Sequence, residues 1–254
     1  MKHILICLSV CALILARSKN VLGQQTQFRA LIVTTTRGWH HESIHYGVVA
    51  LEEMARENFF DAVLLEDPNG FTDDYLKQFQ VIIFLNTTGD ILDSAQQRVM
   101  ERFIRSGKGF VGIHSASDTE YGWEWYTRLV GRMFYIHPRI QTARLTIIDS
   151  TFPGVQGYMG NKLWTDEWYQ FGPETVSGLH YIMTVDESSY DPDADWGTKK
   201  GSGMGRFHPI SWYHAFDGGR SFYTALGHMP TDFSNRDFLD FLYAGIFWAA
   251  TGKK

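Results

Sequence analysis

Short apolar runs alternate with amphipathic segments in the first half of this chain. The segment at residues 43–58 places Val48, Leu51 and Met54 on one helical face, and a second segment opens at Asp93, with Gln96 three positions later as in a capping box. Strands separated by helices of this length predict right-handed crossovers and a mainly parallel sheet covered on both faces. We therefore expect an α/β three-layer sandwich. The predicted strands are residues 30–33, 62–65, 81–85 and 109–113.

The second half is less regular. Strand patterns at residues 210–214 and 221–226 flank Asp217-Gly218-Gly219, a strong hairpin signal. Further strands are expected at 142–148 and 181–185, and an apolar helix at 235–251. Residues 188–204 are rich in Gly, Pro and charge and predict a long mobile loop. With no linker or repeat in the pattern, residues 24–254 are expected to form a single domain.

The first 23 residues have the pattern of a secretory signal peptide. The apolar run 4–16 follows Lys2 and is too short to span a bilayer, and cleavage is expected after Gly23. Both cysteines, Cys7 and Cys11, lie inside this segment, so residues 24–254 contain no thiol or disulfide. We predict an exported, periplasmic protein; a lipid anchor at Cys11 is the weaker alternative.

Composition narrows the class of partner. Hydrophobic residues make up 44% of the chain and charged residues 20%, which is typical of a globular protein. Loss of Lys2, Arg17 and Lys19 with the signal changes the formal net charge from −5 to −8. This acidic balance argues against a nucleic-acid partner, which counterion release would favour only for a basic surface.

Candidate chemistry gathers where the predicted strands end. In open α/β sheets, ligands bind beyond the carboxyl ends of the strands. Four separate segments place polar side chains there, so we expect them to share one pocket. These side chains are His40 and His41 after the first strand, Asn86 and Asp90 after the third, His114 and Asp118 after the fourth, and His228 after the hairpin.

Gly112-Ile113-His114-Ser115-Ala116 resembles the strand–turn–helix elbow that holds a nucleophile in related folds. Here the nucleophile position is a histidine, which can transfer protons near neutral pH. The alternative is that His114 only caps the following helix.

Trp164-Thr-Asp-Glu-Trp-Tyr169 places two carboxylates between aromatic residues. A carboxyl against an indole has a raised pKa and can act as a general acid, and Trp168 could stack on a sugar ring. The alternative is an exposed acidic turn that its tryptophans anchor to the core.

Two further arrangements are open. A divalent ion could be bound by His41, His114 and His228 together with a carboxylate. Arg220 could clamp a carboxylate or a group of hydroxyls, or form an ion pair with Asp217 or Asp237 instead.

Several of these segments together resemble the ThuA-like family, named for trehalose utilisation, in order over residues 27–252. The resemblance implies a class I glutamine amidotransferase-like (flavodoxin-like) fold, with His114 at the amidotransferase cysteine, so amidotransferase activity is not expected. It also implies a role in sugar catabolism on 3-keto-glycosides made by a partner dehydrogenase. The matching segments are Phe28-Arg-Ala-Leu-Ile-Val33, Gly38-Trp-His-His-Glu-Ser-Ile44, Phe84-Leu-Asn-Thr-Thr-Gly-Asp90, Gly109-Phe-Val-Gly-Ile-His-Ser-Ala-Ser-Asp-Thr119, Thr165-Asp-Glu-Trp-Tyr169 and Gly218-Gly-Arg-Ser-Phe-Tyr-Thr-Ala-Leu-Gly-His228.

We therefore expect an enzyme that acts on an oxidised sugar by acid–base chemistry, as a lyase, hydrolase or isomerase, without a required cofactor. His114 is the expected base, Glu167 or Asp166 the acid, and His228 with Arg220 the stabilising group; His41 completes the catalytic set. The alternatives are a non-catalytic carbohydrate-binding accessory protein and a metal-dependent hydrolase. The expected substrate contacts are Asn86, Asp90, Asp118, His137, Trp168, Arg220 and Tyr223.

Overall fold

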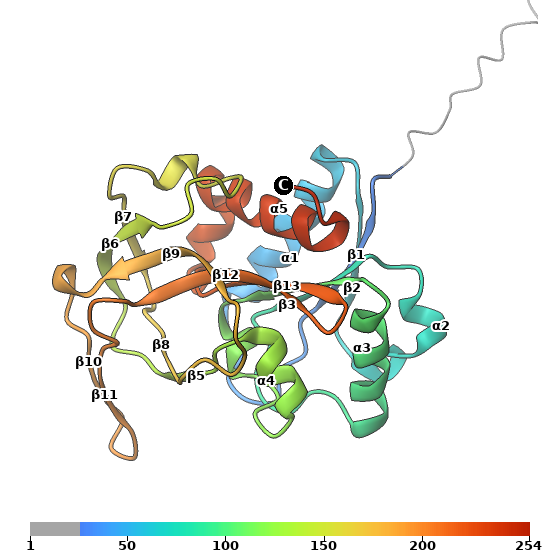
Figure 1. The fold of residues 1–254 in the computed structure, drawn as a ribbon, viewed down its shortest axis with the longest axis horizontal. Coiled ribbons are helices and arrows are strands. Elements are labelled where there is room, and N and C mark those ends of the chain that lie inside the picture. Colours follow the sequence, from blue (N-terminus) through green and yellow to red (C-terminus); the bar gives the residue numbers. More distant parts are fainter. Residues whose placement is uncertain (1–25) are drawn as a thin grey trace, which may run out of the picture.

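The computed structural model describes residues 26–254, and the predicted signal peptide lies outside them. Nine strands form one sheet in the order β2-β1-β3-β4-β13-β12-β9-β6-β7 (Figure 1). The bounds are β1 (Arg29–Val33), β2 (Asp61–Leu65), β3 (Val81–Leu85), β4 (Gly109–Ile113), β6 (Gln141–Ile147), β7 (Leu163–Asp166), β9 (His180–Asp186), β12 (Pro209–Phe216) and β13 (Gly219–Thr224).

The five strands from β2 to β13 are parallel to their neighbours, and the other four extend the sheet in antiparallel pairs. β3 and β4 are buried along their whole length, which is why their sequences are continuous apolar runs. The predicted α/β architecture with a parallel core is therefore confirmed.

Helices cover both faces of the sheet, as predicted for a three-layer sandwich. In Figure 1, α1 and α5 lie on one side, and α3 and α4 on the other. α5 approaches β4 so closely that a Cβ atom at Gly109 would lie 2.2 Å from the carbonyl oxygen of Ala249. The helices are α1 (Ser43–Glu57), α2 (Asp73–Leu76), α3 (Ser94–Arg105), α4 (Glu124–Val130) and α5 (Arg236–Thr251).

Local signals in the sequence fix the ends of these elements. Asp93 accepts hydrogen bonds from the backbone N–H groups of Ala95 and Gln96, and the Gln96 side chain accepts from Asp93 N, which completes the predicted capping box. The hairpin between β12 and β13 turns at Asp217 and Gly218, both with positive φ, as its two-residue turn requires.

The prediction of a long loop at 188–204 is wrong in part. The segment contains a two-stranded hairpin, β10 (Asp193–Asp195) and β11 (Lys200–Ser202), and a second small pair joins β5 (Phe134–Ile136) to β8 (Gln170–Phe171). The Glu187 carboxylate accepts hydrogen bonds from the backbone N–H groups of Met204 and Gly205, and therefore closes the segment at its base. Within residues 26–254, no helix combines the length and apolar character needed to cross a membrane.

Candidate functional site

The elbow after β4 positions His114. Its φ is +49°, a conformation that non-glycine residues rarely adopt, at the start of the 3₁₀ turn His114–Asp118. The hydroxyl of Tyr223 donates to the His114 carbonyl oxygen at 2.7 Å. The Nδ1 atom of His114 lies 2.8 Å from the carbonyl oxygen of Ala225, which can only accept, so Nδ1 carries the proton. Nε2 is therefore left as an acceptor.

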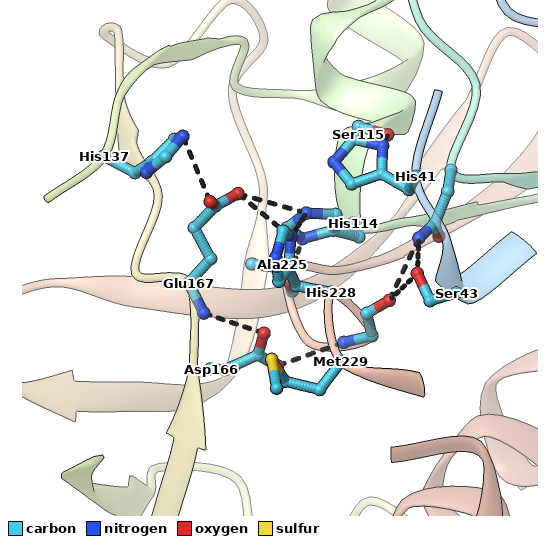
Figure 2. Close-up of polar contacts among 12 residues, drawn as sticks. His41, Ser43, His114, Ser115, His137, Asp166, Glu167, Ala225, His228 and Met229 are labelled. Carbon is cyan, nitrogen blue, oxygen red and sulfur yellow. Dashed lines mark hydrogen bonds and ion pairs between the residues drawn. The ribbon is translucent and has the colours of Figure 1, made fainter. Parts of the chain in front are cut away.

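Around this acceptor the structure gathers three further imidazoles and one carboxylate (Figure 2). Glu167 Oε2 lies 3.5 Å from His114 Nε2 and 3.2 Å from His228 Nδ1, while Glu167 Oε1 lies 3.2 Å from His137 Nε2. His228 Nδ1 also lies 3.2 Å from His114 Nε2. The His41 ring stands edge-on to those of His114 and His228, at centroid distances of 4.9 and 5.4 Å.

Exposure rises stepwise from the floor of this site to its mouth. The His114 side chain is 0% exposed, Glu167 9%, His228 18% and His137 23%. A pocket of about 360 Å³ lies against His137 and Trp196, a size within the range of small-molecule sites. A ligand entering here would meet His137 and His228 before His114.

Burial and mutual contact set the charge states. Burial lowers the pKa of His41 to about 2, and the neighbouring imidazoles add to this effect, so His41 is neutral. Burial also lowers the pKa of His137. For His228, burial is outweighed by the hydrogen bond and charge of Glu167, and its pKa is raised. For Glu167, burial is outweighed by hydrogen bonds from His114 and His228, which hold its pKa well below the usual range.

Glu167 is therefore ionised, and the expectation of a raised pKa against an indole is wrong for this residue. Asp166, the last residue of β7, has the raised pKa because burial dominates. Its side chain is 0% exposed, and its two oxygens accept hydrogen bonds from the backbone N–H groups of Glu167 and Gly227, at 2.8 and 3.1 Å. Asp166 thus fixes the positions of two segments of the site and does not face a ligand.

Three predicted substrate contacts lie away from the cluster. Arg220 is at the opposite edge of the sheet, where it donates to the carbonyl oxygens of Gly107, Ala249 and Ala250. It begins β13, whereas the site lies beyond that strand's end. This structure contradicts both the sugar clamp and the two alternative ion pairs. Trp168 is 1% exposed and donates to Gln141 O, so it cannot stack on a sugar, and Asp90 is exposed on the loop after β3.

Other predicted residues support the site from behind. The Asn86 amide donates to Ser43 Oγ and to the carbonyl oxygen of Gly227, at 2.9 and 3.0 Å. Tyr223 is fully buried and holds the elbow, so its expected contact with substrate is also wrong. Asp118 accepts a hydrogen bond from Tyr121 near the mouth.

Two residues of this region were missed from the sequence. Asp232 forms a hydrogen bond with Asp166, and burial followed by the charge of Asp166 raises its pKa to about 9. Its place in the segment just after His228 was the available signal. Trp196 donates to the carbonyl oxygen of His137 at 3.2 Å, and its ring stands edge-on to His137. A lone tryptophan in an apparent loop gave no such signal.

Comparison with known proteins places this geometry in a family. The model of the ThuA family, described as trehalose utilisation, matches residues 29–249. No curated protein matches the sequence. A putative ThuA-like protein from Bacteroides uniformis superposes with a TM-score of 0.72 at 20% identity, covering 91% of this chain and 94% of its own. A second, from Parabacteroides merdae, has a TM-score of 0.67 at 21% identity, covering 89% and 91%. At these identities the likeness shows the fold.

Proposed function

The chain belongs to the ThuA family, and from this premise we propose that it is an enzyme that acts on an oxidised sugar, such as a 3-keto-glycoside. A keto group acidifies the neighbouring C–H bond, so one base can start an elimination or an isomerisation without a covalent nucleophile. A sugar-oxidising dehydrogenase would supply such a substrate.

One observation carries this proposal: the Glu167 carboxylate bridges two imidazoles that both face the mouth of the site. His137 lies 3.2 Å from one oxygen and His228 lies 3.2 Å from the other. A base and a positively charged group held on opposite ends of one carboxylate can act on adjacent atoms of a substrate. This is the requirement for removing a proton next to a carbonyl group.

His137 is assigned as the base. Its Nδ1 lies 2.8 Å from the carbonyl oxygen of Pro138 and carries a proton, so Nε2 receives the proton of the substrate. The resulting imidazolium is stabilised by Glu167 Oε1, as a carboxylate stabilises histidine in a catalytic triad. The electron pair of the broken C–H bond moves to the carbonyl oxygen, where the positive charge of His228 stabilises the enolate.

This assignment moves the base from His114, as expected from the sequence, to His137. His114 is fully buried and its two ring nitrogens are already engaged with Ala225 and with His228. We assign His114 as a positioning residue for His228. Asp166 is excluded as the acid by its burial and its backbone partners.

The test is deuterium exchange at the carbon next to the ketone, followed by NMR in D₂O with a purified 3-keto-glycoside. This readout detects proton removal whichever bond breaks afterwards. We expect exchange by the wild type, a loss of about 100-fold or more in His137→Gln, and wild-type exchange in His180→Gln, a matched change at an exposed histidine of β9.

Full exchange by His137→Gln would overturn the assignment of the base. Binding of the keto-glycoside by the wild type without any exchange would overturn the proposal and favour the non-catalytic carbohydrate-binding protein. The stacking argument for that alternative is already weakened, because Trp164 and Trp168 are both buried.

A further inference from the structure

We propose that His41, His114, His228 and Glu167 bind one divalent transition-metal ion at the floor of this site. One ligand atom from each of the four residues lies within 4.8 Å of the others. The residues come from four chain segments and would form three imidazole ligands and one carboxylate ligand. This donor set is typical of Zn²⁺ and similar first-row ions, whereas Ca²⁺ and Mg²⁺ prefer oxygen ligands.

The distances agree with tetrahedral coordination. Metal–ligand bonds of about 2.1 Å place the ligand atoms of a tetrahedron about 3.4 Å apart. The three distances among His114 Nε2, His228 Nδ1 and Glu167 Oε2 are 3.2, 3.2 and 3.5 Å. These three atoms therefore already form one face of such a tetrahedron, and His41 would complete it by a small inward movement.

The hydrogen bonds around the cluster leave lone pairs pointing inward. His114 donates its Nδ1 proton to Ala225 O, so Nε2 can only accept, and Glu167 Oε2 is also an acceptor. Without a cation, the Nδ1 proton of His228 is the donor available to both atoms. A metal ion at the centre would satisfy all of these lone pairs at once.

The residues behind the ligands are those that orient metal-bound histidines elsewhere. A metal-bound imidazole donates its other ring N–H to a carbonyl, carboxylate or water, as His114 does to Ala225. Ser115 Oγ lies 3.3 Å from His41 Nδ1, which leaves Nε2 of His41 for the ion. Asp166 fixes the Glu167 backbone in the same way.

The inference deepens the proposed function, on which only its catalytic meaning rests. A bound ion would polarise the keto oxygen at the place assigned above to the charge of His228. His137 contacts the other oxygen of Glu167 and stays outside the ligand set, free to transfer the proton.

The test measures binding directly. Chelator-treated protein is titrated with Zn²⁺ by calorimetry and with Co²⁺ by visible absorption, which reports tetrahedral coordination. We expect one ion per chain, with affinity reduced about 100-fold or more in His228→Gln and in Glu167→Gln. His137→Gln and His180→Gln should bind as the wild type does. Circular dichroism identifies any variant that does not fold.

Absence of Zn²⁺ and Co²⁺ binding by the wild type would overturn this inference, as would unchanged affinity in folded His228→Gln and Glu167→Gln. The two proposals fail separately. A protein that binds Zn²⁺ through these residues but does not exchange the proton of a 3-keto-glycoside retains the metal site and loses the proposed function.

Discussion

A pair of buried carboxyl groups lies directly behind the site, and its protonation should be visible in the stability of the protein. Asp166 is 0% exposed and Asp232 4% exposed. Two carboxylates this close cannot both ionise, and the raised pKa of Asp232, about 9, means that it keeps its proton and donates to Asp166 at neutral pH. The change Asp232→Asn replaces the O–H donor with an N–H donor of nearly the same shape.

The sign follows from proton counting. In the unfolded chain Asp232 has an ordinary pKa of 3.8 and loses its proton above it, whereas the folded protein keeps the proton up to about 9. The stability that the proton contributes is therefore complete below the unfolded pKa and is lost as pH rises towards the folded pKa. The slope is at most about 1.4 kcal/mol per pH unit. Since relaxation and water entry reduce the cost of ionising a buried group, we expect about 1–3 kcal/mol between about pH 5 and pH 8.

Urea unfolding at about pH 5, 6.5 and 8 measures this contribution. Asp232→Asn does not titrate, so its free energy of unfolding should rise relative to the wild type by about 1–3 kcal/mol across this range. Asp74→Asn, at a side chain that is 94% exposed, is the matched control and should follow the wild type at each pH. A difference between wild type and Asp232→Asn that is constant with pH would refute the shared proton.

Two further substitutions separate support of the site from chemistry. Tyr223→Phe removes the hydrogen bond to the His114 carbonyl oxygen, and thermal or urea unfolding should show a loss of about 1–2 kcal/mol; an unchanged stability would contradict its role in holding the elbow. Arg220→Lys removes the forked contacts to the carbonyl end of α5 and should lower the free energy of unfolding by about 2 kcal/mol. Its rate of deuterium exchange should equal that of the wild type, and a slower rate would return Arg220 to the site.

The parallel part of the fold could be predicted because its strands are buried on both faces. The runs at 81–85 and 109–113 are apolar at each position, and the structure begins and ends β3 and β4 at these residues. Helix α3 was equally readable from its capping box. The hairpin β10–β11 was missed because its stability comes from distant partners, in particular the Glu187 carboxylate, and not from its own pattern.

The position of Arg220 shows the limit of assigning a side chain to a strand without asking which end it occupies. β13 is parallel to β4 and pairs Arg220 with Gly109, the first residue of β4. Four residues of strand then separate Arg220 from Thr224, about 13 Å. The sequence indicated a strand that leads to His228, but Arg220 is at the end from which it departs.

The carboxylate at the centre of the site lies in the part of the sheet that the rule for parallel strands does not cover. His114 and His228 follow strands of the parallel half, so their meeting could be expected from topology. Glu167 follows β7, the last strand of the antiparallel extension, and His137 follows the small strand β5. Adjacent residues of an extended chain point in opposite directions, which is why Asp166 is buried under the site while Glu167 reaches into it. The parallel half thus supplies His114 and His228, and the antiparallel half supplies the carboxylate that joins them to the base, so neither half alone contains the proposed chemistry.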